Sequence, residues 1–289
     1  MDDVKNSQPN GCIDAHAHVW TPDLARYPLA ARYSSRDMEP ASFTADEMLS
    51  VARPAGVDRV VLIQMIFYGF DNSYMLDCLR DYPGVFSGVA QIDAYGADPA
   101  EEMARLRKLG VRGVRIAPPK HGAAEWLDGA GMHAMWKCGA QSAMAICPLI
   151  DVDDLPAVDR MCQKFPETPV VFDHCARIGG DGQIRECDLA LLCQLARHSS
   201  TRVKLSAFYF LGGKQPPYVD LAPMIRRLCD AFGPERLMWA SDCPFQVQPP
   251  HTYEASLNLI RHHLDFLSDS DKQWILRRTA ESMFFAETG

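Results

Sequence analysis

The sequence predicts an α/β fold, a distorted (β/α)8 TIM barrel that forms a single domain over residues 1–289. Short apolar segments alternate with helix-forming segments, over a length close to the roughly 250 residues of such barrels. The apolar segments are nearly continuous, which is typical of parallel strands covered on both faces. Histidine and aspartate follow several of them, and a barrel brings all its strand ends to one mouth. For this reason we prefer the barrel to the alternative, a doubly wound open sheet.

Eight segments rich in aliphatic and β-branched residues are expected to form the strands. They are residues 11–20, 59–64, 86–92, 111–116, 144–150, 169–174, 201–208 and 236–241. Residues 59–64, with the sequence Arg-Val-Val-Leu-Ile-Gln, show the pattern clearly.

Capping residues and turn residues set the limits of the expected helices. Asp98 is placed as an N-cap, with Pro99 at the first helical position and Gly110 after the last one. Thr44 and Glu47 have the spacing of a capping box. The expected helices are residues 44–55, 72–82, 98–109, 132–141, 154–165, 188–198 and 218–232, followed by two more at 253–266 and 271–285.

The composition predicts a cytoplasmic protein without nucleic-acid or membrane partners. Lysine and arginine total 29 against 37 acidic residues, so the net charge is −8. The first residues lack the apolar stretch of a secretory signal, and no apolar run is long enough to cross a bilayer. The ten cysteines are scattered without C-x-x-C spacing, so we expect buried thiols rather than disulfides.

Candidate metal ligands lie within the first expected strand, at the end of the sixth and directly after the eighth. The sequence Ile-Asp-Ala-His-Ala-His-Val-Trp over residues 13–20 carries His16 and His18, and strand alternation predicts that Asp14 shares their face. His174 is the last residue of the sixth strand, and Asp242 directly follows the eighth. A short His-x-His pattern is weak alone, but several strand ends of this kind together favour a functional site.

Five segments together resemble the amidohydrolase superfamily, in its branch of lactonases and hydrolases of the 2-pyrone-4,6-dicarboxylate type. They are residues 14–20, 64–72, 173–177 (Asp-His-Cys-Ala-Arg), 241–244 (Ser-Asp-Cys-Pro) and 279–284 (Thr-Ala-Glu-Ser-Met-Phe). Their order and spacing carry the resemblance, which spans the whole chain. It implies a barrel enzyme that hydrolyses a small carboxylated lactone or a related ester.

The resemblance also implies one divalent metal ion, with zinc as the first choice, held by His16, His18, His174 and Asp242. Neutral imidazoles and a carboxylate suit such an ion, with an open position for water. The ion would lower the pKa of that water and polarise the carbonyl. Asp242 and His174 are the expected catalytic residues, with Asp242 taking the proton of the water and passing it to the leaving oxygen.

Two departures from the family pattern argue against a binuclear metal centre. Many members carry a bridging lysine or glutamate on strand four, where this chain has Arg115. Many also carry a histidine on strand five, where this chain has Cys147 and its neighbours. Some relatives resembling this sequence work without a metal. In that alternative the histidines bind the substrate carbonyl and Asp242 alone activates water.

Six further residues are candidates for substrate binding. Arg115 and Arg177 lie beside the site motifs, and arginine binds a carboxylate through two parallel hydrogen bonds. Lys204, within the seventh strand, is expected either in a buried ion pair or in contact with substrate. The remaining candidates are polar residues after the second strand, namely Gln64, Tyr68 and Asn72.

Two other functions stay open at this stage. A decarboxylase of the same superfamily is disfavoured by the missing strand-five histidine. A catalytically inactive barrel that binds a small acid is disfavoured because every candidate ligand is intact. The sequence leaves open the substrate, the oligomeric state, including a homo-oligomer, and whether Cys147, Cys175 or Cys243 touches the site.

Overall fold

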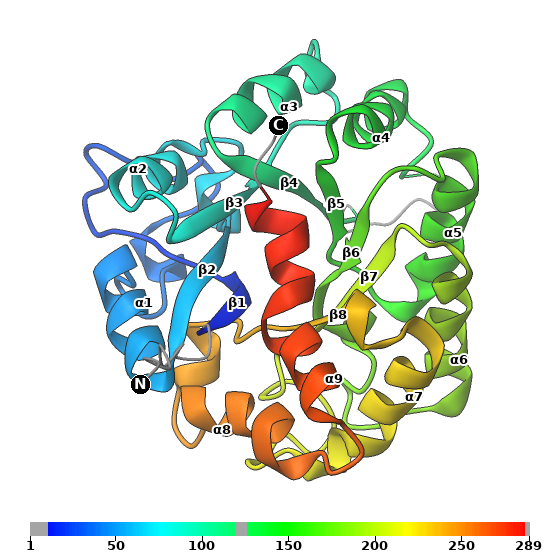
Figure 1. Ribbon diagram of the computed structural model, residues 1–289. Helices are drawn as coiled ribbons and strands as arrows, with labels where there is room; N and C mark the ends of the chain where they lie inside the picture. Colours follow the sequence, from blue (N-terminus) through cyan, green and yellow to red (C-terminus); the bar gives the residue numbers. More distant parts are fainter. Residues whose placement is uncertain (1–10, 119–125, 287–289) are drawn as a thin grey trace, which may run out of the picture.

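The computed structural model describes residues 11–118 and 126–286, and its strands form a ring (Figure 1). Eight parallel strands pair in chain order, from β1 to β8. They are β1 Cys12–Ala17, β2 Val57–Ile63, β3 Phe86–Gln91, β4 Val111–Ile116, β5 Ala145–Pro148, β6 Val170–Phe172, β7 Thr201–Leu205 and β8 Leu237–Trp239. A bridge between Ala17 and Cys243 joins the two ends of the series. The predicted barrel is therefore confirmed.

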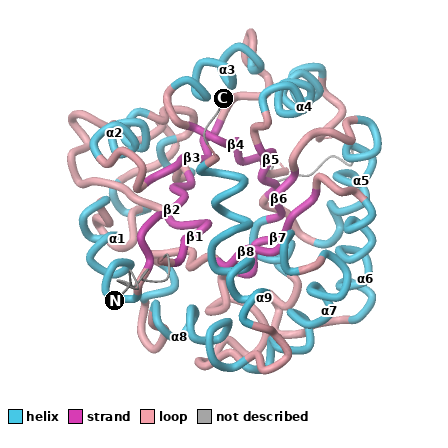
Figure 2. The backbone as a smooth tube through the Cα atoms, in the orientation of Figure 1, coloured by secondary structure: helices cyan, strands magenta, loops and turns pink. Residues whose placement is uncertain are grey.

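Helices surround the ring of strands, as Figure 2 shows. They are α1 Ala45–Ala52, α2 Ser73–Asp81, α3 Pro99–Lys108, α4 Ala130–Ser142, α5 Leu155–Lys164, α6 Glu186–Gln194, α7 Ala222–Phe232, α8 Tyr253–Asn258 and α9 Asp269–Gln273. The predicted caps are confirmed. Asp98 accepts a hydrogen bond from the backbone of Glu101 at 2.9 Å, and Thr44 and Glu47 form their reciprocal pair. The helix α1 ends at Ala52, earlier than expected, because Pro54 forces a tighter turn.

The C-terminal segment closes the amino-terminal end of the barrel. After α9 the helix continues in wider turns over Trp274–Arg278 and Glu281–Phe285, and it crosses the ring of strands in Figure 1. Ala280, Met283 and Phe284 pack against the side chains that fill the barrel, among them Val61 and Met238. Full burial of a phenylalanine side chain stabilises a fold by about 1.5–3 kcal/mol. The C-terminal segment, which plugs this end of the barrel, is therefore a substantial part of the core.

A bulge near the end of β1 changes which way its side chains point. The pairing of β1 with β2 shifts register between Asp14 and Ala17. Ala15 packs inside the barrel, whereas Ala17 packs between the strands and the helices. Asp14 accepts a hydrogen bond from Tyr253 of α8, at 2.9 Å. The prediction that Asp14 shares a face with the two histidines is therefore wrong, because the bulge breaks strict alternation.

Five of the ten cysteines are buried, four are partly buried and Cys187 is exposed, so the expectation of buried thiols holds for half of them. All ten cysteines lie in the described ranges and none of them forms a disulfide there. Cys147 is inside the barrel, and Cys175 and Cys243 are in the outer core. Within residues 11–118 and 126–286, no helix is both long enough and apolar enough to span a membrane.

Candidate active site

His16 and His18 leave the end of β1 side by side, with their Nε2 atoms 3.3 Å apart. The Nδ1 atom of His18 lies 2.8 Å from the carbonyl oxygen of Ile63, at the end of β2. Because a carbonyl can only accept, Nδ1 carries the proton and the lone pair of Nε2 faces His16. Both rings are almost completely buried. Burial, and then the charge of Lys204, lower the pKa of His16 well below its ordinary value, which favours the neutral ring.

Asp242 lies just beyond β8 and faces both histidines. Its Oδ1 is 3.2 Å from His18 Nε2 and 3.4 Å from His16 Nε2, and it has no hydrogen-bond donor among the described residues. Its Oδ2 accepts a hydrogen bond from the hydroxyl of Tyr209 at 2.7 Å. Burial by itself would raise the pKa of Asp242, but His174 and the other two histidines hold it below its usual range. The buried carboxylate therefore stays ionised.

His174 is placed by an unusual backbone turn after β6. Residues 174–177 all have φ between 51° and 56°, the left-handed region that side chains with a Cβ rarely adopt. Such residues cost free energy and persist where the surrounding structure demands them. The turn brings His174 Nδ1 within 2.8 Å of Ser206 Oγ and its Nε2 within 3.9 Å of Asp242 Oδ2. Three distant strand ends thus meet in one cluster, where the sequence placed them.

A network of buried charges supports His16 from within the barrel. The ammonium of Lys204 is completely buried, 3.0 Å from Asp173 Oδ1 and 3.2 Å from His16 Nδ1. Arg115 Nε is 3.2 Å from Asp173 Oδ2. Burial alone would raise the pKa of Asp173, but Lys204, His16 and Arg115 outweigh it and hold that pKa well below its usual range. Of the two alternatives for Lys204, the structure shows the buried ion pair.

The other substrate-binding candidates are held by neighbours in different ways. Arg115 reaches the histidine cluster, with Nη2 at 3.0 Å from His16 Nε2 and a side chain 10% exposed. Arg177 is more open and forms a two-point contact with Asp151, at 2.8 Å and 2.9 Å. Both side chains keep some access to solvent, so each remains a candidate for binding a substrate.

The polar residues after β2 form hydrogen bonds with backbone groups of their own loop, of β3 and of the loop after β1. Gln64 donates to the carbonyl of Asp71, and Asn72 exchanges hydrogen bonds with the backbone of Gln91 at 2.9 Å and 3.1 Å. The hydroxyl of Tyr68 accepts from the backbone of Thr21 at 3.2 Å. These contacts order the loop between β2 and α2. Within residues 11–118 and 126–286, no hydrogen bond links the side chains of these three candidates to those of His16, His18, His174 or Asp242.

The donor atoms of His16, His18 and Asp242 suit a metal ion, because all three lie within 4.8 Å of one another. The Oδ1 of Asp242 without a donor also fits a cation. His174, expected as a fourth ligand, is not part of this donor set. The guanidinium of Arg115 would compete with a metal ion for His16. This group can only donate, so at 3.0 Å it engages the same His16 Nε2 lone pair that would bind an ion.

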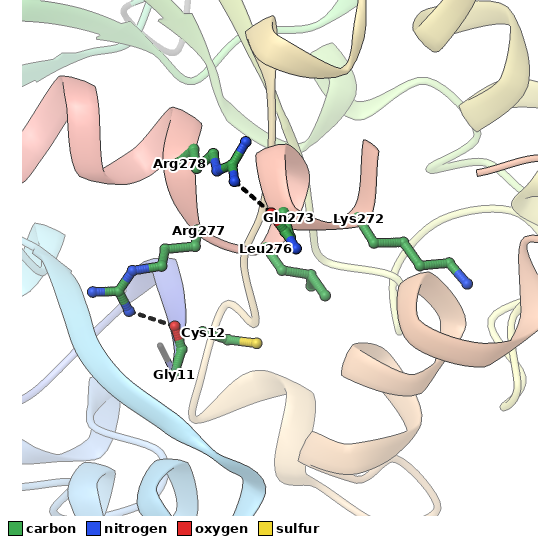
Figure 3. A pocket seen from close by; sticks show the side chains of 7 residues that line it. All are labelled: Gly11, Cys12, Lys272, Gln273, Leu276, Arg277 and Arg278. Atoms are coloured by element: carbon green, nitrogen blue, oxygen red, sulfur yellow. Dashed lines mark hydrogen bonds between the residues drawn. The ribbon is translucent and has the colours of Figure 1, made fainter. Parts of the chain in front are cut away.

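A separate cavity of about 300 Å³ lies at the opposite end of the barrel (Figure 3). It is lined by Cys12 at the start of β1 and by residues of the C-terminal segment, including Lys272, Leu276 and Arg277. Arg277 donates to the backbone of Gly11 there. None of the residues that line this cavity is a histidine or a carboxylate. The histidine cluster, which gathers three imidazoles and a carboxyl group, therefore stays the candidate active site.

A family model described as amidohydrolase matches residues 13–286 of the chain. The chain belongs to the amidohydrolase family. This amidohydrolase is 27% identical over 241 residues to an L-fucono-1,5-lactonase from Burkholderia ambifaria, with 80% of each chain covered. It is 28% identical over 253 residues to a 2-pyrone-4,6-dicarboxylate hydrolase from Comamonas testosteroni, covering 82% of this chain and 77% of that one. The resemblance of the sequence motifs is confirmed, and the protein is an enzyme of this superfamily.

Solved structures share the barrel. A proposed 2-pyrone-4,6-dicarboxylic acid hydrolase from Pseudomonas putida matches with a TM-score of 0.80 and 26% identity, over 98% of this chain and 100% of that one. An amidohydrolase from Burkholderia multivorans with bound zinc has a TM-score of 0.80 and 19% identity, over 96% and 99%. A 5-carboxyvanillate decarboxylase from Sphingomonas paucimobilis has a TM-score of 0.70 and 14% identity, over 96% and 100%. The last two likenesses show the fold alone.

Sequence reasoning missed three polar residues that contact the cluster: Asp173, Ser206 and Tyr209. Asp173 directly precedes His174 in the same motif, so its position was a usable signal. Ser206 and Tyr209 follow β7 in a segment without any recognisable pattern. Only the packing of that loop against β6 and β8 reveals their role.

Proposed function

We propose that this amidohydrolase opens a small carboxylated lactone or cyclic ester by attack of water. The observation that carries the proposal is the geometry of the buried Asp242 carboxyl group, which turns an oxygen without a donor toward two imidazoles. A carboxylate in this setting can accept the proton of a water molecule. The names of the two curated relatives, both lactone-ring hydrolases, support a lactone as substrate.

The reaction requires Asp242 to act first as a base and then as an acid. It takes a proton from water, whose oxygen bonds to the carbonyl carbon of the lactone. The ring C–O bond then breaks, and Asp242 returns the proton to the leaving oxygen. The product is the open hydroxy acid. His174, held by Ser206, is proposed to orient the carbonyl beside Asp242.

Cationic side chains near the cluster are proposed to bind the carboxylate of the substrate. Arg115 and Arg177 offer planar groups with several donors. Arg177 would exchange its exposed partner Asp151 for the substrate, because Asp151 itself is 66% exposed and gives up little on returning to water. Gln64, Tyr68 and Asn72 are proposed to shape the same mouth by ordering the loop after β2. The acidic overall charge argues against a nucleic-acid or membrane partner and leaves a small molecule as the proposed partner. A cytoplasmic location is proposed as well, with a homo-oligomer left open.

We propose that His16, His18 and Asp242 can hold one divalent ion, with zinc the first choice for this donor set. When bound, such an ion supplies Lewis-acid polarisation of the carbonyl and lowers the pKa of water. The chain prepares the site by fixing the tautomer of His18 through Ile63 and by burying all three donors.

A metal-independent route is favoured by one contact, between Arg115 Nη2 and His16 Nε2 at 3.0 Å. When Arg115 donates to His16, its guanidinium supplies the positive charge beside the histidines that a metal ion would otherwise supply. The histidines would then bind the substrate carbonyl, and Asp242 alone would activate water. Because strand five lacks the histidine that many members of the superfamily carry, a decarboxylase stays the weaker alternative.

The proposal is tested on protein purified without added metal or chelator. Its metal content is measured by elemental mass spectrometry, and its products from L-fucono-1,5-lactone and 2-pyrone-4,6-dicarboxylate are analysed. We expect hydroxy acid without release of carbon dioxide. One ion per chain, lost together with activity in His16→Ala, would support the metal route. Activity that survives chelation would support the other route. Release of carbon dioxide, or no turnover of any lactone, would reject the proposed function.

A further inference from the structure

The hydroxyl of Tyr209 makes a direct contact with the proposed base. It donates a hydrogen bond of 2.7 Å to Oδ2 of Asp242. A hydrogen bond to a carboxylate is short and roughly twice as strong as one between neutral groups. The single hydroxyl hydrogen of Tyr209 is thereby committed to this oxygen. The other oxygen, Oδ1, remains turned toward the two histidines.

The ring of Tyr209 is held by the loops after β7 and β8. Its centroid lies 6.4 Å from that of Phe245 and 6.0 Å from that of His251. His251 is itself fixed by the hydroxyl of Tyr218, 2.8 Å from its Nδ1. Gln246, completely buried, donates to the same hydroxyl at 2.9 Å. Rings and hydrogen bonds thus define the position from which Tyr209 reaches Asp242.

Asp242 needs such a restraint because its own surroundings do not distinguish its two oxygens strongly. The carboxylate turns about a broad, roughly two-fold torsion. The Nε2 atom of His174, which also faces Oδ2, is 3.9 Å away, which is too far for a hydrogen bond. Among the described residues, Tyr209 is therefore the side chain that holds Oδ2 in place by hydrogen bonding.

We propose that Tyr209 is a positioning residue for lactone opening, whose hydroxyl fixes the rotation of the Asp242 carboxylate so that Oδ1 accepts the proton of the attacking water. This inference rests on the proposed hydrolysis. The proton moves from water to Oδ1, and the hydroxide oxygen bonds to the carbonyl carbon as Tyr209 keeps Oδ2 occupied. When the ring C–O bond breaks, Oδ1 returns the proton to the leaving oxygen. Tyr209 gains and loses no proton in the cycle.

The test is the variant Tyr209→Phe, which removes the hydroxyl and keeps the ring. We expect kcat to fall by between about tenfold and a hundredfold, the scale associated with a misplaced catalytic group. KM should stay unchanged, because the hydroxyl is used by Asp242 and not by the substrate. The matched control is Tyr27→Phe, which removes a partly buried tyrosine–aspartate hydrogen bond of 2.6 Å to Asp77, outside the histidine cluster. Its kcat and KM should equal those of the wild type.

The outcomes separate this inference from the proposed function. A wild type that turns over no lactone rejects the function itself. An active wild type with an unchanged kcat in Tyr209→Phe rejects only the positioning role. A raised KM with unchanged kcat would also overturn it, because Tyr209 would then bind substrate. Thermal unfolding of both variants checks that a lower kcat does not reflect an unfolded enzyme.

Discussion

The two ends of the barrel are built from opposite kinds of side chain. The carboxyl end gathers ionisable groups in the interior, including His16, Asp173 and Lys204, none of which is exposed. Its backbone is unusual as well, with positive φ at residues 174–177 and at Asp242. The amino end is filled by apolar residues of the C-terminal segment, such as Phe284. Burying charge and strained backbone costs stability, which an apolar plug restores.

This contrast predicts that substitutions at the carboxyl end change activity and that substitutions at the amino end change stability. Barrel enzymes in general separate the two in this way. One contact joins the ends here, because the ammonium of Lys204 lies 5.6 Å from the ring centroid of Phe284. The following predictions test how far the separation holds, beginning with the largest effect.

Asp242→Asn should abolish nearly all turnover while the fold persists. We expect a loss of about 100- to 10,000-fold in kcat, the range for removing a general acid–base group. The amide keeps the shape of the carboxyl group, so the fold should persist, with a modest fall in the unfolding temperature because the favourable contacts of the carboxylate with the histidines are lost. Steady-state kinetics and calorimetry measure the two quantities. Activity near that of the wild type would remove Asp242 from the role of base.

Phe284→Ala should show the opposite pattern. Phe284 is 1% exposed, and removing a buried phenylalanine costs about 3–5 kcal/mol of unfolding free energy. Urea unfolding measures this loss. Phe285→Ala is the matched control, since the neighbouring Phe285 is only partly buried and should lose much less. A kcat that falls as far in Phe284→Ala as in Asp242→Asn would contradict the separation of the two ends.

Asp14→Asn should change how stability depends on pH. Burial raises the pKa of Asp14 from 3.8 to about 6, so the folded state holds this proton more tightly than the unfolded state does. Its contribution to stability is therefore largest below about pH 4 and is lost as the pH rises toward about 6, by up to about 3 kcal/mol. Asparagine can still accept the hydrogen bonds from the backbone of His16 and Ser241, but its side chain does not titrate.

The measurement is the difference in unfolding free energy between wild type and Asp14→Asn as a function of pH. Between about pH 4 and pH 6, the unfolding free energy of the wild type should fall relative to that of the variant. Above this range the difference between the two should stay constant. A difference that stays constant with pH would show that the carboxyl of Asp14 does not titrate there.

Arg115→Met should produce the smallest of these effects. Loss of a charge-assisted hydrogen bond should raise KM for a carboxylated lactone by about tenfold. Arg112→Met, on the same strand, is the control, because Arg112 bonds to the backbone carbonyls of Arg107 and Val111. KM for a lactone without a carboxylate should change much less. Equal KM values in Arg115→Met and the wild type would remove Arg115 from substrate binding.

Most of the barrel could be predicted from the sequence because its signals are local. Apolar segments mark the strands, and cap residues such as Asp98 and Thr44 mark where helices begin. The meeting of His16, His18, His174 and Asp242 followed as well, since parallel strands in a barrel end at one mouth. Strand lengths were less accurate. The strands β6 and β8 are shorter than expected, and His174 and Asp242 lie in the turns beyond them.

Other features depend on contacts between residues far apart in the chain. A bulge turned Asp14 away from the histidines, although strict alternation had placed it beside them. The ion pair of Lys204 with Asp173 and the contact of Tyr209 with Asp242 join neighbouring strand ends, and no spacing along the chain encodes either. By itself the sequence determined which residues form strands and which chemistry gathers at their ends, because periodicity and residue type act locally. Only the tertiary structure decided which atoms of those residues meet, because distances between side chains depend on register, bulges and loop packing together.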